Sequence, residues 1–177
     1  ANNGQLNVTF GGASLFGNIA IDSLGQIILS SNSNTTFFDD LSNKGELRVS
    51  PGSVATFFGD VSGPGNYTGT GSKFYEALFS PGSSPGLVID EGDATFGSGA
   101  VVVMEIGGAD QGSEYDHYDV AGQLSLNGTL VISLLNGYAP GEGEVFDLFD
   151  WGALSGEFFR LDFSGATLAK GLAWDFS

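Results

Sequence analysis

The sequence has no cysteine, a single histidine and only five lysine and arginine residues among its 177 positions. Without cysteine the chain can form neither disulfides nor thiolate metal sites. The 21 aspartate and glutamate residues give a net charge of −16. Because affinity for nucleic acids comes from lysine and arginine, we expect no nucleic-acid partner. No stretch approaches the roughly 18 apolar residues of a membrane-spanning helix, so we also expect no membrane insertion.

Proline is scarce too, with five residues, whereas glycine is abundant, with 29. The glycines follow no Gly-X-Y period, which excludes a collagen-like chain. A hydrophobic content of 41% with 15 phenylalanines is too apolar for a disordered chain. No segment shows the apolar period of a helix, so the sequence predicts an all-β protein with almost no helix. Because the sequence begins with Ala1 instead of methionine, we expect a secreted chain from which a signal peptide has been removed.

The first 78 residues contain a repeat. Glycines at positions 4, 25, 45 and 65 each begin a similar short string, at intervals of 21, 20 and 20 residues. In the first three strings the second and fourth residues after the glycine are apolar, as in a strand with one buried face. This regular period predicts a β-solenoid, and a β-sandwich of hairpins is the alternative.

Equivalent residues of successive solenoid repeats stack into ladders that point into the core. The three predicted ladders are Leu6 with Ile27 and Leu47, Val8 with Leu29 and Val49, and Phe16 with Phe37 and Phe57.

The repeats end at the string FSPGSSPG, residues 79–86, which contains two Pro-Gly steps. Proline fixes φ and removes an N–H donor, and glycine supplies the positive φ of tight turns. The string therefore predicts a double turn that no central strand crosses. We divide the chain into solenoid repeats at 1–78 and a C-terminal β module at 79–177 that continues the solenoid.

Further short strings follow FSPGSSPG in a fixed order: EIGG at 105–108, YD at 115–116, LNGTL at 126–130, FDL at 146–148, LSG at 154–156 and LAWD at 172–175. This ordered set resembles the C-terminal β module of bacterial surface proteins built from autotransporter-associated β-strand repeats, many of which carry a PEP-type sorting signal. The resemblance implies a secreted or cell-surface β-solenoid, and it supplies no catalytic residue. In such relatives further strands and a sorting tail usually follow the position of Ser177.

Acidic residues are the candidate metal ligands. Asp39, Asp40 and Asp60 lie at equivalent places in neighbouring repeats, and Asp90 and Asp93 lie in a later acidic turn. Carboxylate oxygens suit Ca²⁺, so these five residues are candidate Ca²⁺ ligands, with a solvated surface as the alternative. Adjacent strand residues point to opposite faces, so Asp39 and Asp40 can share a site only at a turn.

The only histidine, His117, lies in the string EYDHYD, residues 114–119, and is predicted to be a surface-loop residue. A Ser-His-Asp triad would have this one possible base, and we predict that the chain is not an enzyme.

Two functions fit the sequence. The first is an extracellular structural subunit that joins identical subunits end to end by strand pairing, in a surface fibre, surface layer or biofilm matrix. The second is a carbohydrate-binding or carbohydrate-active solenoid, such as an adhesin or a protein like the polysaccharide lyases, with extracellular polysaccharide as its partner. This second function requires exposed aromatic residues along a groove, for which Tyr67, Tyr75 and Tyr115 are the candidates.

Overall fold

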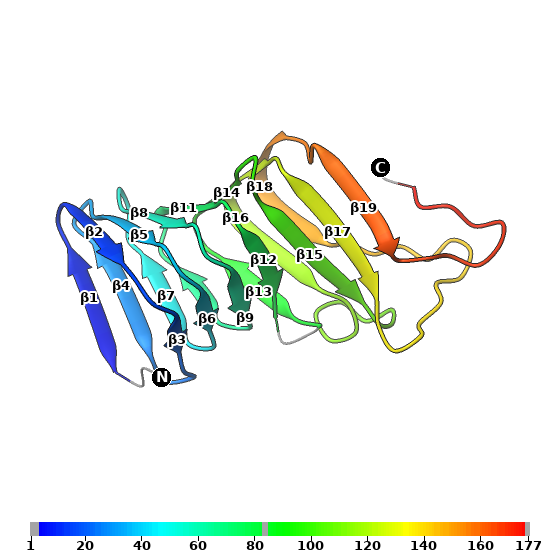
Figure 1. Cartoon of the computed structure of the whole chain (residues 1–177), viewed down its shortest axis with the longest axis horizontal. Coiled ribbons are helices and arrows are strands. Elements are labelled where there is room, and N and C mark those ends of the chain that lie inside the picture. The colour runs from blue at the N-terminus through cyan, green and yellow to red at the C-terminus, as the bar shows by residue number, and fades with distance from the viewer. Residues whose placement is uncertain (1–3, 83–84, 176–177) are drawn as a thin grey trace.

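The computed structural model describes residues 4–82 and 85–175, and this part of the chain is a β-solenoid without helices. The chain winds through successive coils whose strands pair in parallel with those of the next coil (Figure 1). The predicted all-β solenoid is therefore confirmed. Among the described residues there is no helix long and apolar enough to span a membrane.

Three rows of strands run along the solenoid (Figure 1). The first row contains β1 (Gln5–Thr9), β4 (Gln26–Ser30), β7 (Glu46–Val49), β10 (Asn66–Thr68) and β13 (Leu87–Asp90). The second contains β2 (Gly12–Leu15), β5 (Asn34–Phe37), β8 (Val54–Phe57), β11 (Ser72–Tyr75) and β14 (Asp93–Phe96). The third contains β3 (Ile19–Ile21), β6 (Leu41–Asn43), β9 (Val61–Gly63), β12 (Leu78–Pro81), β15 (Val101–Ile106), β17 (Thr129–Leu134) and β19 (Arg160–Gly165).

In the last two coils the first and second rows merge into single long strands, β16 (His117–Leu126) and β18 (Phe149–Gly156). The first part of β16 pairs with β13 and its second part with β14, and β18 pairs along both parts. The register shifts where the corner would be, between Val120 and Gln123. Gly122 lies there against the backbone of Gly92, and a Cβ would come within 2.5 Å of the Gly92 carbonyl oxygen. Only glycine therefore fits at this crossing point.

Two of the predicted ladders have the predicted register. Leu6 lies opposite Ile27 and Ile27 opposite Leu47, and Val8, Leu29 and Val49 align in the same way. The members in β4 and β7 are fully buried, whereas Leu6 is 38% exposed because it lies in the first coil. A strand at the end of a solenoid lacks a neighbour on one side, so its inward side chains stay partly in water.

The third predicted ladder is wrong in its first member. Leu15, not Phe16, lies opposite Phe37 and so in line with Phe57. The turn before β5 has one residue more than the turn before β2, and a shift of one residue moves a side chain to the opposite face of a strand. Phe16 is consequently 73% exposed.

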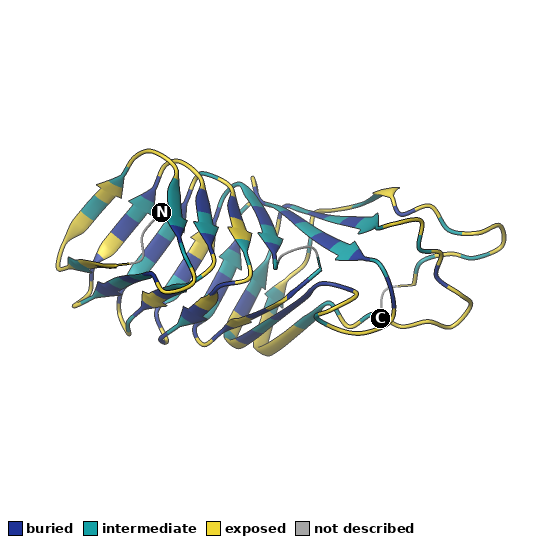
Figure 2. Cartoon of the chain, turned by 90° about the horizontal axis from the view of Figure 1, so that it is seen from below, coloured by how far each residue is buried: buried dark blue, intermediate teal, exposed yellow. Residues whose placement is uncertain are grey.

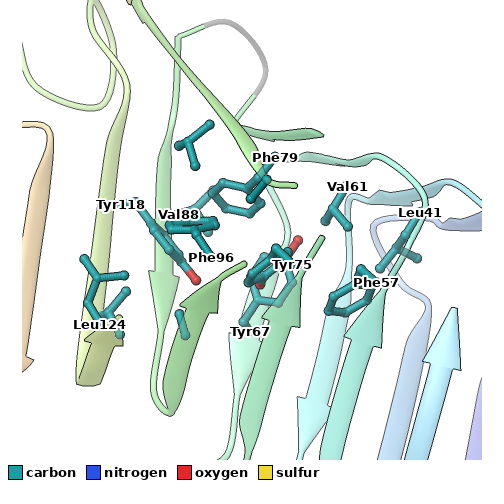
Figure 3. Packing of buried hydrophobic residues seen from close by; sticks show 14 of the residues in the cluster. Leu41, Phe57, Val61, Tyr67, Tyr75, Phe79, Val88, Phe96, Tyr118 and Leu124 are labelled. Atoms are coloured by element: carbon teal, nitrogen blue, oxygen red, sulfur yellow. The ribbon is translucent and has the colours of Figure 1, made fainter. Parts of the chain in front are cut away.

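Aromatic rings fill the middle of the core (Figure 3). Phe37, Phe57 and Tyr75 stack in successive coils, with ring centroids 4.9 and 5.1 Å apart. The ring centroid of Phe79 lies 4.8 Å from that of Tyr75 and 4.8 Å from that of Tyr118. The separations between Phe37, Phe57 and Tyr75 match the spacing of about 4.8 Å between paired strands, so these rings form a continuous stack with one ring per coil. Phe79 adds a second ring in the coil of Tyr75.

The first three residues of the FSPGSSPG string end a strand, and no described strand crosses the string. β12 continues to Pro81, which lies opposite Gly63 of β9. β15 pairs only with Leu78 and Phe79 of this strand, so the missing N–H of Pro81 falls where the pairing to β15 has ended. Ser83 and Ser84 lie outside the described residues. The boundary at residue 79 falls within β12, and the third row of strands runs across it.

Two of the strings near the end of the chain, FDL and LAWD, lie outside the strands. Of the segment Val145–Phe149, only Phe149 belongs to a strand, and Leu172–Asp175 is irregular. Trp174 instead folds back: its indole Nε1 donates a hydrogen bond of 3.0 Å to the carbonyl oxygen of Ala166, and its ring stacks on Phe163. The last paired strands are therefore β18 and β19.

Candidate functional site

Each end of the solenoid presents strands that pair on one side only. At the N-terminal end β1, β2 and β3 pair with β4, β5 and β6, and no other described strand adjoins them (Figure 1). At the other end β18 pairs with β16, and β19 pairs with β17. The residues described thus leave two open edges, which we call the N-terminal edge (β1–β3) and the C-terminal edge (β18 and β19).

The backbone of β1 shows which groups the N-terminal edge offers. The carbonyl oxygen of Gly4 accepts a hydrogen bond from Gln26 N–H at 3.0 Å, and Phe10 N–H donates to the carbonyl oxygen of Ser30. Successive residues of a strand direct their N–H and C=O groups to opposite sides. The even-numbered residues therefore bond to β4, and the backbone groups of Gln5, Asn7 and Thr9 face the open side.

Both edges also present the apolar cross-section of the core. At the C-terminal edge Trp151 lies opposite Val120 and Leu161 opposite Leu130, which are core positions, yet these two side chains are 47% and 42% exposed. Exposed and partly buried residues likewise line the strand at the N-terminal end, whereas the middle strands alternate with buried residues (Figure 2). The inward apolar residues of the N-terminal edge are Leu6, Val8, Leu15, Ile19 and Ile21, of which Ile21 is fully buried.

The N-terminal edge lacks the features that usually block edge pairing. Its three strands read QLNVT, GASL and IAI, without a charged residue or a proline. Natural edge strands are commonly protected by lysine, proline or an inward-pointing charge. At the C-terminal edge the charges of Arg160 and Asp162 are paired with each other at 2.8 Å.

The candidate Ca²⁺ ligands Asp39, Asp40 and Asp60 lie on exposed turns, where they cap the backbone of neighbouring coils. Asp39 Oδ2 accepts a hydrogen bond of 2.7 Å from Gly17 N–H, and Asp40 Oδ1 accepts one of 3.1 Å from Asp60 N–H. Asp60 Oδ1 accepts one of 3.2 Å from Leu78 N–H. In the described part of the chain no three Asp, Glu or His side chains gather closely enough to hold a metal ion. Calcium binding here stays a prediction.

Asp90 and Asp93 occupy different environments. Asp93 Oδ1 accepts a hydrogen bond of 2.9 Å from Gln123 N–H at the surface. Asp90 is fully buried and forms an ion pair of 2.8 Å with Lys73, which is fully buried as well. The sequence reasoning missed Lys73, although the alternation of β11 places it on the same inward face as Tyr75.

His117 is buried, so the prediction of a surface-loop histidine is wrong. Its Nδ1 lies 2.8 Å from the carbonyl oxygen of Asp147 and 2.8 Å from Gln111 Nε2. Both partners come from long insertions between strands, residues 107–116 and 135–148, that fold over the start of β16. Loop packing of this kind leaves no periodic signal in the sequence.

The neighbouring Asp116 is a second buried polar group, and the sequence analysis assigned it no role. It accepts hydrogen bonds from Gly86 N–H at 2.7 Å and Glu105 N–H at 2.8 Å. Burial raises the pKa of Asp116 from 3.8 to about 7, because desolvation outweighs these two hydrogen bonds. Its carboxyl group ties the string after β12 to β15 and to the start of β16.

The tyrosines proposed for a carbohydrate groove do not line one. Tyr67, Tyr75 and Tyr115 are 1%, 1% and 5% exposed and belong to the core. An exposed aromatic residue does lie elsewhere: Phe74 of β11 belongs to a shallow groove of about 150 Å³ on the outer face of the second row. The other residues that line this groove are Ser72, Asp93, Thr95, Gln123 and Ser125.

A second exposed aromatic feature follows the turns after β2, β5 and β8. The Phe16 ring stacks on Phe38 at 4.8 Å, and Phe38 stacks on Phe58 at 5.8 Å. The three rings stay 73%, 42% and 53% exposed, and their stacking reinforces the corner of the solenoid.

Comparison with models of known protein families gave no match, and no curated protein or solved structure matched the chain either.

Proposed function

We propose that this chain is a subunit of an extracellular fibre, surface layer or biofilm matrix, in which identical subunits join end to end by β-strand pairing. The observation that carries the proposal is the pair of open edges, each with strands that pair on one side only and with half-exposed core residues. Unpaired strand edges are templates for pairing with another chain. A solenoid with open strands at both ends can extend its sheets from one subunit into the next.

The strand order of the two edges is compatible with such a junction. β18 carries both the first and the second row, so β1 and β2 of the next subunit would pair with its two parts, and β3 would pair with β19. The core would then continue across the junction, since Trp151 belongs to the same ladder as Leu6. The contact is head-to-tail and therefore gives an open filament unless the rotation between subunits closes a ring.

The charge of the chain sets the conditions for assembly. A net charge of −16 makes subunits repel one another, and salt or Ca²⁺ reduces this repulsion. The exposed carboxylates of Asp39, Asp40 and Asp60 would be neutralised most readily. The secreted or cell-surface location rests on the resemblance to surface proteins with autotransporter-associated repeats, and the role is non-enzymatic.

A proline at the N-terminal edge tests the proposal. Asn7→Pro removes an N–H that faces away from β4, so the subunit should keep its β-sheet circular dichroism and its melting midpoint while losing strand pairing. The matched control Asn7→Ala keeps the N–H. We expect electron microscopy and sedimentation to show filaments for the intact chain and for Asn7→Ala, and monomers for Asn7→Pro.

Two results would refute end-to-end pairing. One is an intact chain that stays monomeric at high concentration, in high salt and with Ca²⁺. The other is Asn7→Pro assembling as the intact chain does.

Carbohydrate binding is the second candidate, and the groove around Phe74 is the observation that favours it. An aromatic side chain among hydroxyl, amide and carboxylate groups provides the apolar surface and the hydrogen-bonding partners that a sugar chain requires. Phe74→Ala should lower retention on an insoluble polysaccharide, whereas Phe58→Ala, an exposed aromatic outside the groove, should not. Equal retention of both variants would remove this candidate.

A further inference from the structure

The core of the fourth and fifth coils contains an ion pair that is closed off from water. Lys73 occupies the inward position of β11, in line with Ala55 and Ala94 of the neighbouring coils. Asp90 ends β13 and lies opposite Tyr67. Both side chains are 0% exposed, and their Nζ and Oδ1 atoms are 2.8 Å apart. The other two ion pairs among the described residues each have an exposed partner.

The surroundings of this pair orient both groups. The Tyr118 hydroxyl donates to Asp90 Oδ2 at 2.8 Å, and Gly92 N–H donates to Oδ1 at 3.0 Å. Lys73 Nζ donates to the carbonyl oxygen of Gly71 at 3.2 Å. A Cβ on Gly92 would lie 2.9 Å from Lys73 Nζ, so the glycine leaves room for the lysine head group.

Burial acts on the charge of Asp90. Desolvation raises the pKa of Asp90, against the opposing effect of Lys73 and of the hydrogen bonds. Separated charges are costly in an apolar core, and transfer of one proton from the ammonium to the carboxylate would remove both charges. Amide formation requires this neutral pair of amine and carboxyl group. A desolvated, neutral lysine is a nucleophile. Because the fold already holds the two groups in contact, the reaction does not incur the entropy cost of bringing them together.

We propose that Lys73 and Asp90 join covalently, as an intramolecular amide bond between Nζ and Cγ. Nζ lies 2.8 Å from Oδ1, which is bonded to Cγ, the carbon that it attacks. The Nζ lone pair forms the new N–C bond while the hydroxyl on Oδ1 leaves as water. Both hydrogens of that water come from the former ammonium group, the third stays on the amide nitrogen, and nothing is oxidised or reduced.

Tyr118 is the positioning residue for this step. Its hydroxyl already donates to Oδ2, the oxygen on which negative charge develops when Nζ attacks the carbon. The amide bond links β11 to β13 and therefore ties the fourth coil to the fifth across the core. In a chain without cysteine it would provide the covalent constraint that a disulfide provides elsewhere. The proposal does not depend on assembly of the subunits.

Intact-mass spectrometry of the denatured full chain tests the bond. We expect a mass lower than that of the sequence by one water molecule, and a proteolytic digest that contains a branched peptide joining residues 73 and 90. Lys73→Met should have the full mass of its sequence. The control Lys170→Met, which changes an exposed lysine, should keep the loss of water. Tyr118→Phe should slow the reaction by roughly 10²-fold, so that uncross-linked chain accumulates.

An intact chain with the full mass of its sequence would overturn the proposal, and this measurement does not depend on whether any variant folds. A loss of water that persists in Lys73→Met would overturn it as well, because the lost water would then come from another site.

Discussion

Two leucines on one ladder provide a graded test of the solenoid and of its open end. Leu47 is fully buried between Ile27 and Tyr67 of the adjoining coils, whereas Leu6 is 38% exposed in the first coil. Leu47→Ala leaves a cavity closed on both sides and should lower the free energy of unfolding by roughly 2–5 kcal/mol. Leu6→Ala should cost only about 1.5 kcal/mol, at about 0.8 kcal/mol per buried methylene reduced for its exposure.

Chemical denaturation followed by circular dichroism measures both changes, and Leu24→Ala is the matched control. Leu24 is 82% exposed on a turn, so its loss should change the free energy of unfolding by less than about 0.5 kcal/mol. The denaturant dependence must stay unchanged among the variants, since a solenoid can lose cooperativity when one coil is weakened. A Leu47→Ala variant as stable as Leu24→Ala would refute the inward ladder. In filaments, by contrast, Leu6→Ala should become more costly, because a second subunit buries this residue.

Two further predictions concern charge. Burial raises the pKa of Asp116 to about 7, above its unfolded value of 3.8, so its contribution to stability is present below pH 3.8 and is lost as pH rises through 7. The melting midpoint should therefore decrease as the pH is raised from 4 to 7, and this decrease should be smaller in Asp116→Asn. An equal dependence of the melting midpoint on pH in the two proteins would contradict the raised pKa of Asp116. Assembly should increase with ionic strength or Ca²⁺ and fall with EDTA, and light scattering that responds to none of them would contradict the role of screening.

The proposed fibre also explains why the molecule tolerates exposed core residues. Trp151 and Leu161 would contribute more free energy if covered than they do half in water. The strands of the N-terminal edge, without charges or proline, are a hazard for a monomer. A subunit that pairs at both ends uses these features instead of requiring caps. A covalent Lys73–Asp90 link would add resistance to unfolding within each subunit, at a point remote from both edges.

The sequence by itself determined the repeat, its period and the inward positions of the first coils. Glycines at intervals of 21, 20 and 20 residues and the alternation after each of them are local signals, and parallel stacking of equal repeats converts them directly into register. For that reason the ladders beginning at Leu6 and Val8 were predictable to the residue. Where one turn gains a residue, as before β5, the alternation flips, and Phe16 was assigned to the wrong face.

Only the tertiary structure decided which groups of the longer, later coils meet. The insertions at 107–116 and 135–148 cover His117, and the pairing of β16 with β13 brings Tyr118 to Asp90. Lys73 and Asp90 belong to different strands of different coils, and neither carries a local signal of a partner. Their contact follows from the path of the chain around the core, because side chains far apart in sequence become neighbours only when the coils are stacked. The same stacking determines that Tyr67 and Tyr75 fill the core, whereas Phe74, between Lys73 and Tyr75, faces outward.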